Sequence, residues 1–313
     1  MPHNTLSLYV ITVLIWGSTW YAIKLQLGVV EPHVSVAYRF AIAAVLLLAW
    51  CVVRGKDMRY VARDHVWMAT QGLFLFSANY AVFYAATGLL TTGLIAVVFS
   101  TIVAWNILFG RLFFQTPVTV QMVLGALSGF GGLALVFWPE VANLTLQDEA
   151  TYGLMLCIIA TVLASLGNMA SARNQFRGLP VLQVNAFGMA YGAVFTFLYA
   201  WASGMNFAWE GSLTYVSSLL YLAVFGSIIA FGTYLTLLGR IGAGRASYAT
   251  VLFPVVALSL SVVLEDYHFT PAAIGGAVLV LLGNALVLAK PKHFFRNRRQ
   301  SASDQSKAGD HKR

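Results

Sequence analysis

The feature that most constrains this chain is a series of apolar stretches, each about 20 residues long. A helix of that length spans the hydrocarbon core of a bilayer, which is roughly 30 Å thick. Charged residues make up only 10% of the sequence, whereas soluble domains carry about 25%. Lipid offers no hydrogen-bond partners to an open backbone, so spanning segments of this length must be helical. The sequence therefore predicts an all-α integral membrane protein.

Ten such stretches can be counted, and the connections between them are short and often contain Gly or Pro. The first stretch follows "MPHNT" with no basic segment or cleavage site, so we expect a retained helix and no signal peptide. The expected transmembrane helices cover residues 6–25, 33–53, 66–87, 92–113, 118–138, 151–172, 181–201, 213–238, 246–264 and 271–289.

The distribution of charge predicts the orientation of these helices. With the N-terminus in the cytoplasm, 17 of the 19 Lys and Arg residues fall in cytoplasmic segments. The opposite connections carry Asp and Glu but no Lys or Arg. Cytoplasmic loops are enriched in basic residues, so both termini are expected in the cytoplasm. The net charge of +8 then reflects membrane orientation and not nucleic-acid binding, and residues 291–313 are expected to form a disordered basic tail near anionic lipids.

The second half of the chain repeats features of the first at offsets of 148 to 154 residues. The matched features, in chain order, are Pro32 with Pro180, Gly88-x4-Gly93 with Gly239-x4-Gly244, and Thr116-Pro117-x11-Gly129 with Thr270-Pro271-x11-Gly283. They indicate one duplication with small insertions and deletions. Each half holds five spans, an odd number, which predicts two repeats of inverted topology. Such repeats are typical of transporters with a substrate site near the membrane midplane.

Two segments resemble a known family. The stretch "LIWGSTWYAIKL" (residues 14–25), followed by Pro32 and Arg39-Phe40, resembles the opening of the EamA-type domain of the drug/metabolite transporter (DMT) superfamily. Residues 246–283 resemble the end of a second such domain. The resemblance implies five-helix repeats at 6–138 and 151–290, and export of a small metabolite from a bacterial cell across its inner (plasma) membrane.

Aromatic-rich spans resemble the YddG-like aromatic amino acid exporters in particular. The first half departs from the family pattern, because Ser100-Thr101-Ile102-Val103 stands where a proline would match Pro254. The fourth helix is therefore not expected to bend as the ninth does.

Ionisable residues are informative by their absence from the spans. No Asp or Glu is expected deep in any span, and all six His fall in loops or tails. An intramembrane enzyme would need a nucleophile with a base, or a metal with its ligands, so we expect no enzyme, no cofactor and no metal site. The same absence favours facilitated diffusion or exchange over proton antiport. Glu31 and Glu265, at the outer helix ends, are the nearest titratable alternatives.

Two basic residues lie within or at the edge of spans. Lys24 follows Trp16 and Trp20 at four-residue spacing, so the three share one helix face. Two interpretations of Lys24 stay open: its amine reaches the headgroups, or it lies at the outer mouth of a cavity and attracts a carboxylate or pairs with Glu31. Arg39 lies about two turns into the second span. We expect it to pair with Glu31 or with backbone carbonyls, and a purely structural role stays open.

The candidate substrate-binding residues lie on faces expected to meet between the halves. They are Trp16, Trp20, Lys24, Asn79, Tyr80, Phe83, Ser100, Ser165, Asn168, Tyr234 and Tyr248. Asn79 and Asn168 are favoured because an amide has four hydrogen-bonding sites to satisfy. Ser and Thr in spans also bond their own or a neighbouring helix, so packing is the alternative for those side chains. Pro254 interrupts the ninth span and predicts a hinge.

Together these features predict an exporter that works by alternating access and moves amino acids with aromatic or bulky apolar side chains. An exporter of nucleobases, nucleosides or lipophilic drugs is the alternative of the same class, and a membrane scaffold or sensor is the alternative of a different class. The expected partners are a small-molecule substrate and membrane lipids, with no nucleic acid. Gly125-x3-Gly129 and Gly188-x3-Gly192 predict close packing between helices or between protomers, so a monomer and a homodimer both stay open.

Overall fold

The computed structural model describes residues 4–26, 28–87, 89, 95, 98–136, 138, 149–264 and 270–288, and these parts form ten helical passes. The first half contains α1 (Thr5–Lys24), α2 (Pro32–Val53), α3 (Ala62–Leu73), η1 (Phe74–Ala78), α4 (Asn79–Thr87), α6 (Ile102–Phe114) and α7 (Val120–Val136). The second half contains α9 (Glu149–Phe176), α10 (Val181–Ala202), α11 (Leu213–Tyr221), η2 (Leu222–Ile229), α12 (Ala230–Ile241), α13 (Ala243–Ala246), α14 (Tyr248–Leu264) and α15 (Pro271–Leu288).

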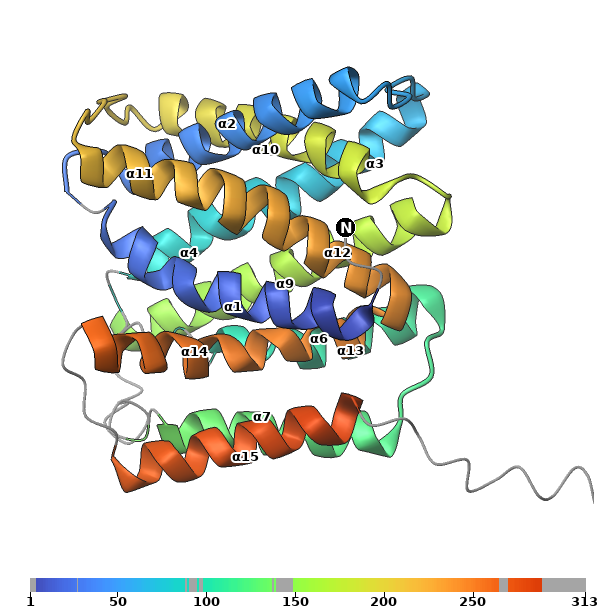
Figure 1. Cartoon of the computed structure of the whole chain (residues 1–313), viewed down its shortest axis with the longest axis vertical. Helices are drawn as coiled ribbons and strands as arrows, with labels where there is room; N and C mark the ends of the chain where they lie inside the picture. Colours follow the sequence, from blue (N-terminus) through green and yellow to red (C-terminus); the bar gives the residue numbers. More distant parts are fainter. Residues whose placement is uncertain are drawn as a thin grey trace, which may run out of the picture.

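The passes lie side by side and their connections alternate between two ends of the molecule (Figure 1). Connections 54–61, 115–119 and 177–180 lie at the right-hand end of the view, and connections 25–31 and 203–212 lie at the left-hand end. Most helix bounds agree with the sequence prediction within a few residues. Ten is an even number of passes, and it agrees with the alternation of basic and acidic connections along the sequence.

Length and polarity differ between the passes. Within the described ranges, five helices are long and apolar enough to cross a membrane: Thr5–Ile23, Pro32–Val53, Thr151–Phe176, Val181–Ala202 and Leu213–Ile241. Three apolar helices are shorter, at Val98–Phe114, Val120–Val136 and Ile274–Val287. Ten helices were predicted, and they differ in length and hydropathy. The third pass begins with polar residues in α3, which lower its hydropathy.

Helix starts follow local capping rules. Pro32 occupies the first turn of α2, where its missing N–H is not needed for the helix. The Asn4 side chain accepts a hydrogen bond from the Leu6 N–H at the start of α1. The Ser212 hydroxyl does the same for the Tyr215 N–H at the start of α11. Short polar caps thus mark where the chain enters these apolar helices.

Equivalent elements of the two halves pack on one another. The second helices α2 and α10 contact each other along their length, as do the last helices α7 and α15. Each half also extends its first helix into the other: α1 packs against α12 and α14, and α9 packs against α4 and α6. The third pass of each half contains a π-helical segment, η1 or η2, and the 151-residue offset carries Phe74 of η1 to Phe225 within η2. The structure therefore repeats the internal symmetry read from the sequence.

Glycines bring the paired helices into close contact. A Cβ on Gly132 of α7 would lie 2.6 Å from the Gly276 carbonyl oxygen of α15. A Cβ on Gly192 of α10 would lie 2.6 Å from the Phe76 Cβ in η1. Such contacts are typical of membrane helices, whose small residues let backbones approach. In the predicted pairs, a Cβ on Gly125, Gly129 or Gly188 would likewise lie within 3.1 Å of another helix of the same chain, so these faces pack between helices.

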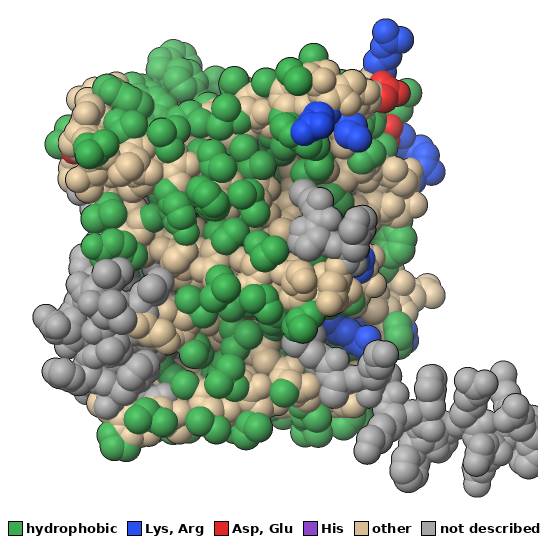
Figure 2. All heavy atoms as spheres, viewed as in Figure 1, with side chains coloured by type: hydrophobic (Ala, Val, Ile, Leu, Met, Phe, Trp, Pro, Cys, Tyr) green, Lys and Arg blue, Asp and Glu red, His purple; other side chains and the backbone are tan. Residues whose placement is uncertain are grey.

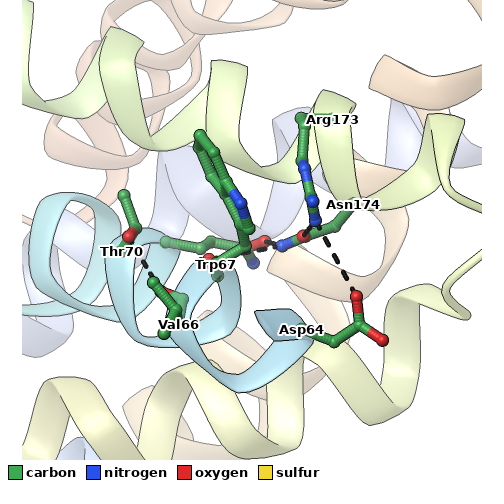
Figure 3. Close-up of polar contacts among 7 residues, drawn as sticks. Asp64, Val66, Trp67, Thr70, Arg173 and Asn174 are labelled. Atoms are coloured by element: carbon green, nitrogen blue, oxygen red, sulfur yellow. Dashed lines mark hydrogen bonds and ion pairs between the residues drawn. The ribbon is translucent and has the colours of Figure 1, made fainter. Parts of the chain in front are cut away.

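A polar network joins α3, α9 and α10, and Figure 3 shows its contacts between α3 and α9. The Arg173 guanidinium lies over the Trp67 ring at 4.5 Å and 4.0 Å from an Asp64 carboxylate oxygen. The Asn174 amide donates to Gln71, whose own amide donates to Asn185 of α10. These contacts hold α9, α3 and α10 together. The polar groups that form them lie outside the apolar middle of the bundle.

The surface matches a protein surrounded by lipid. Figure 2 shows apolar side chains spread across the helical face, and Lys and Arg side chains gathered at the right-hand end. Exposed large apolar residues occur on both α2 and α7, for example Val45, Leu46, Leu124 and Leu127. In water such a surface would be an aggregation site, whereas in a bilayer it faces acyl chains. The fold is therefore that of a multi-pass membrane protein.

Candidate functional site: a central cavity

A cavity of about 200 Å³ lies between the two halves of the bundle. Side chains from both halves enclose it: Trp16, Thr19 and Ile23 of α1, Arg39 of α2, Leu75 of η1, Asn79, Tyr80 and Phe83 of α4, Ile95 and Phe99 between α4 and α6, Ile102 of α6, Ala164 and Asn168 of α9, Phe231 and Tyr234 of α12, and Thr250 and Phe253 of α14. The wall is mostly aromatic and aliphatic, with few polar groups, which is the composition of a site for a small organic ligand.

Six of the candidate residues line this cavity: Trp16, Asn79, Tyr80, Phe83, Asn168 and Tyr234. They come from four helices that are far apart in sequence. The offset of the internal repeat pointed to one such correspondence, because it relates Phe83 to Tyr234. The structure places both of these rings on the same cavity.

Three candidate residues lie away from the cavity wall. The Ser165 hydroxyl donates to the Asn106 side-chain oxygen at 2.7 Å and so packs α9 against α6. The Tyr248 hydroxyl donates to the Met122 carbonyl, which attaches the start of α14 to α7. Ser100 is buried and is not among the lining residues. Packing, the alternative left open for such groups, describes Ser165 and Tyr248 best.

Trp20 and Lys24 belong to α1, but their side chains lie outside the described part of the chain, as does Glu265. Their place at the mouth of a cavity stays a prediction. Pro254 lies inside α14, which continues through it as a helix. Thr250, one turn before Pro254, lines the cavity, so the backbone carbonyl that proline leaves without an amide partner lies beside the site.

The sequence missed several lining residues, of which Arg39 is the most important. Phe231, Phe253 and Thr19 are also new. The three aromatic rings nearest the Trp16 indole belong to Phe231, Tyr234 and Phe253, with centroid distances of 4.7, 5.1 and 5.3 Å. No periodicity in the sequence could show that α12 and α14 place their aromatic faces beside α1.

Arg39 is only 4% exposed and lines the cavity. Its Nε–H donates to the Ser227 hydroxyl oxygen at 2.8 Å and its Nη2 donates to the Gly226 carbonyl at 3.2 Å. The Trp16 indole N–H donates to the same carbonyl at 3.0 Å. Both acceptors belong to η2, where the wider π-helical turn changes the backbone pairing of an α-helix. Of the two partners expected for Arg39, backbone carbonyls are thus found.

A second cavity of about 600 Å³ lies between α6, α9, α12 and α13. Asn106 lines this second cavity, whereas Asn168 lines the central one. The Asn168 amide donates to the Asn106 oxygen at 3.4 Å and to the Tyr234 hydroxyl at 3.1 Å. Buried hydrogen bonds across α6, α9 and α12 therefore link the wall of one cavity to the wall of the other.

Titratable groups are sparse around both cavities. Among the described lining residues, the central cavity has one ionisable cation, Arg39, and neither cavity has an Asp, Glu or His. The described residues also contain no cluster of three His, Cys, Asp or Glu that could hold a metal ion. The arrangement can bind a small solute by stacking, hydrogen bonds and one positive charge.

Comparison with known proteins gives the family. The EamA-like transporter family matches this chain twice, over residues 4–138 and 151–289. An uncharacterized transporter of Archaeoglobus fulgidus is 26% identical over 90% of this chain and 97% of its own. The uncharacterized inner membrane transporter YedA of Escherichia coli K12 is 29% identical over 89% of this chain and 90% of its own.

A protein of Escherichia coli K12 named as a probable amino-acid metabolite efflux pump is 26% identical over 88% of this chain and 92% of its own. A solved crystal structure superposes with a TM-score of 0.77 at 20% identity, over 92% of this chain and 97% of that one. That likeness supports the fold alone. With both halves matched by one family, this chain belongs to the EamA-like transporter family of the DMT superfamily, and it is a membrane transporter and not an enzyme.

Proposed function

We propose that this transporter exports small metabolites, and foremost amino acids with aromatic or bulky apolar side chains, by alternating access around the central cavity. The observation that carries the proposal is the cavity wall. It combines aromatic rings around Trp16 with the amides of Asn79 and Asn168. Rings stack on an apolar side chain, and amides bond a polar head group. The relative named as an amino-acid metabolite efflux pump supports the same class.

Alternating access is supported by the two cavities and the two repeats. Residues 6–138 and 151–290 are proposed as the two moving units, inverted relative to each other. The hydrogen bonds among Asn106, Asn168 and Tyr234 are the proposed barrier between the cavities. The second cavity, which includes Arg240, is proposed to face the cytoplasm, since basic residues mark that side. Pro254 is proposed as a hinge in α14.

Uncoupled transport is supported by the composition of both walls. A proton-coupled carrier needs a group in the pathway that gains and loses a proton near neutral pH. The described residues of both walls contain no Asp, Glu or His. An arginine stays protonated throughout the physiological range, so Arg39 cannot serve that purpose. Facilitated diffusion or exchange is therefore proposed.

The test is efflux of labelled L-phenylalanine from loaded cells that express the wild type or the Asn79→Leu variant. The wild type is expected to empty the cells faster than cells without the protein. The Asn79→Leu variant is expected to lose that increment at equal expression, because Asn79 lines the cavity and its Oδ1 has no hydrogen-bond partner in the described parts of the chain. Wild-type efflux of uridine or of a lipophilic dye, with none of phenylalanine, would instead favour the alternative substrates.

A further inference from the structure

We infer that Arg39 is the anchor for a carboxylate on the transported solute, so that the substrate class is an α-amino carboxylate and not a neutral or cationic compound. The inference rests on the proposed function and names the chemistry of that same cavity. It also gives Arg39 a role in binding, beyond the structural one considered above.

The protein holds the Arg39 guanidinium in place but does not pair all of its N–H donors. Arg has five N–H donors in a planar fork. The contacts within the protein use the Nε–H and one Nη2–H, directed at Ser227 and Gly226. The aromatic rings of Phe40 and Tyr80 lie 5.3 and 5.8 Å from its Cζ atom. The backbone and the rings therefore fix the orientation of the fork, and donors remain for a ligand in the cavity that Arg39 lines.

The charge of Arg39 lacks a counter-ion within the described residues. None of the acidic residues there forms an ion pair with Arg39, and Glu31, the partner expected from the sequence, lies exposed at the N-cap of α2. A buried cation without an anion is costly in a membrane, where such residues commonly mark substrate or ion pathways. An anionic ligand would neutralise this charge, and carboxylates match the arginine fork with two hydrogen bonds.

The remaining polar groups match the other end of an amino acid. The side-chain oxygens of Asn79 and Asn168 are buried and have no hydrogen-bond donor among the residues that the structure describes. Both residues line the same cavity as Arg39. Unpaired acceptors need N–H groups, and the ammonium of an amino acid supplies three. The aromatic rings then receive the apolar side chain. The cavity thus offers one cation, two acceptors and an apolar wall.

The same charge argues against lipophilic cations. A protonated amine would meet the like charge of Arg39 in a cavity with a mostly apolar wall, and like charges in such surroundings repel strongly. A neutral nucleoside would leave the arginine without a counter-ion. Of the solutes considered for this fold, only those with an anionic group satisfy Arg39.

The first experiment uses counterflow of labelled L-phenylalanine into proteoliposomes, with matched competitors. 3-Phenylpropanoate retains the carboxylate, and 2-phenylethylamine lacks it. We expect phenylpropanoate to compete at least about tenfold better than phenylethylamine, since hydrogen bonds to a charged group contribute about 1.5–3 kcal/mol. In Arg39→Gln this preference should disappear. In Arg54→Gln, a change at an exposed arginine beyond the end of α2, it should persist. An unchanged preference in Arg39→Gln would overturn the inference.

Arg39→Lys covers the case in which Arg39→Gln does not fold. It retains a cation but loses the fork, and we expect it to keep the preference for phenylpropanoate at reduced affinity. Equal competition by the acid and the amine in the wild type itself would overturn the inference without any variant.

The second experiment does not depend on the identity of the substrate. Thr19 lines the cavity beside Arg39, because a Cβ on Gly226 would lie 3.1 Å from Thr19 and 3.2 Å from the Arg39 guanidinium. In a Thr19→Cys variant with both native cysteines changed to Ala, we expect a sulfonate-bearing methanethiosulfonate to react at least about tenfold faster, relative to free thiol, than a trimethylammonium one. Arg39→Gln should remove that difference.

These results separate the two hypotheses. If phenylalanine is not exchanged but the anionic reagent reacts faster, the proposed amino-acid substrates are refuted and the anion site is supported. Exchange of phenylalanine together with equal reaction of both reagents would retain the proposed function and overturn the role of Arg39.

Discussion

Replacement of Asn168 by Leu separates a role in binding from a role in packing. Asn168 is 1% exposed and donates to Tyr234 and Asn106. Hydrogen bonds between membrane helices contribute about 0.6 kcal/mol on average and at most about 1.7. One of these two is long, at 3.4 Å, so their loss should cost about 1 kcal/mol of stability. Leu also removes the unpaired Asn168 oxygen, which offsets part of that loss.

The effect on transport should be larger than the effect on stability. A hydrogen bond between the Asn168 oxygen and a substrate ammonium would contribute about 1.5–3 kcal/mol, which is roughly 10- to 100-fold in affinity. The assay is phenylalanine counterflow at several concentrations in proteoliposomes, beside thermal unfolding of the same preparations in detergent. We expect a large loss of flux at low phenylalanine concentration with a melting temperature close to that of the wild type.

Asn185→Leu is the matched control for this change. Asn185 is also 1% exposed, has one hydrogen-bonded atom and one unpaired atom, and lies on α10 away from both cavities. Its replacement should change stability by a similar amount and leave flux within about twofold of the wild type. Normal flux in Asn168→Leu, or an equal loss in both variants, would refute the assignment of Asn168 to the site.

Two further predictions concern glycines. Gly132→Ala should lower the melting temperature, because the added Cβ would lie 2.6 Å from the Gly276 carbonyl oxygen. Gly131→Ala should not lower it, because the nearest neighbour of that Cβ would lie at 3.8 Å. An equal melting temperature for both variants would contradict the close α7–α15 contact. Gly226→Ala should weaken the affinity for phenylalanine while the protein stays folded. The added Cβ would lie 3.2 Å from the Arg39 guanidinium and would push the guanidinium away from the Gly226 carbonyl. Unchanged affinity would show that this carbonyl does not orient Arg39.

Much of the fold could be predicted because lipid allows few solutions. The length of apolar stretches gave the helices, and Pro32 and Pro271 gave two of their starts. The π-helical segments η1 and η2 could not be foreseen, since their residues are as apolar as those around them. The polar residues at the start of α3 are visible in the sequence, but the expected span began only at residue 66, whereas α3 begins at Ala62.

The site was predicted in part. Whether a polar residue lines the cavity or packs between helices depends on its neighbours in the tertiary structure. Asn168 and Ser165 share one face of α9 and both donate to Asn106, yet only Asn168 lines the central cavity. Arg39 was expected to pair with Glu31 or with backbone carbonyls, and it was not among the candidate binding residues. Its surroundings come from η2, nearly 190 residues later in the chain, so only the tertiary structure brings them together.

The most direct test of the proposed transport is counterflow of labelled L-phenylalanine into wild-type proteoliposomes, with and without an imposed pH gradient. An uncoupled carrier with an aromatic cavity should give saturable exchange that the gradient does not change. Accumulation driven by the gradient would contradict the absence of coupling and point to a titratable group such as Glu31 or Glu265. No exchange of phenylalanine or of any other amino acid would contradict the proposed substrate class.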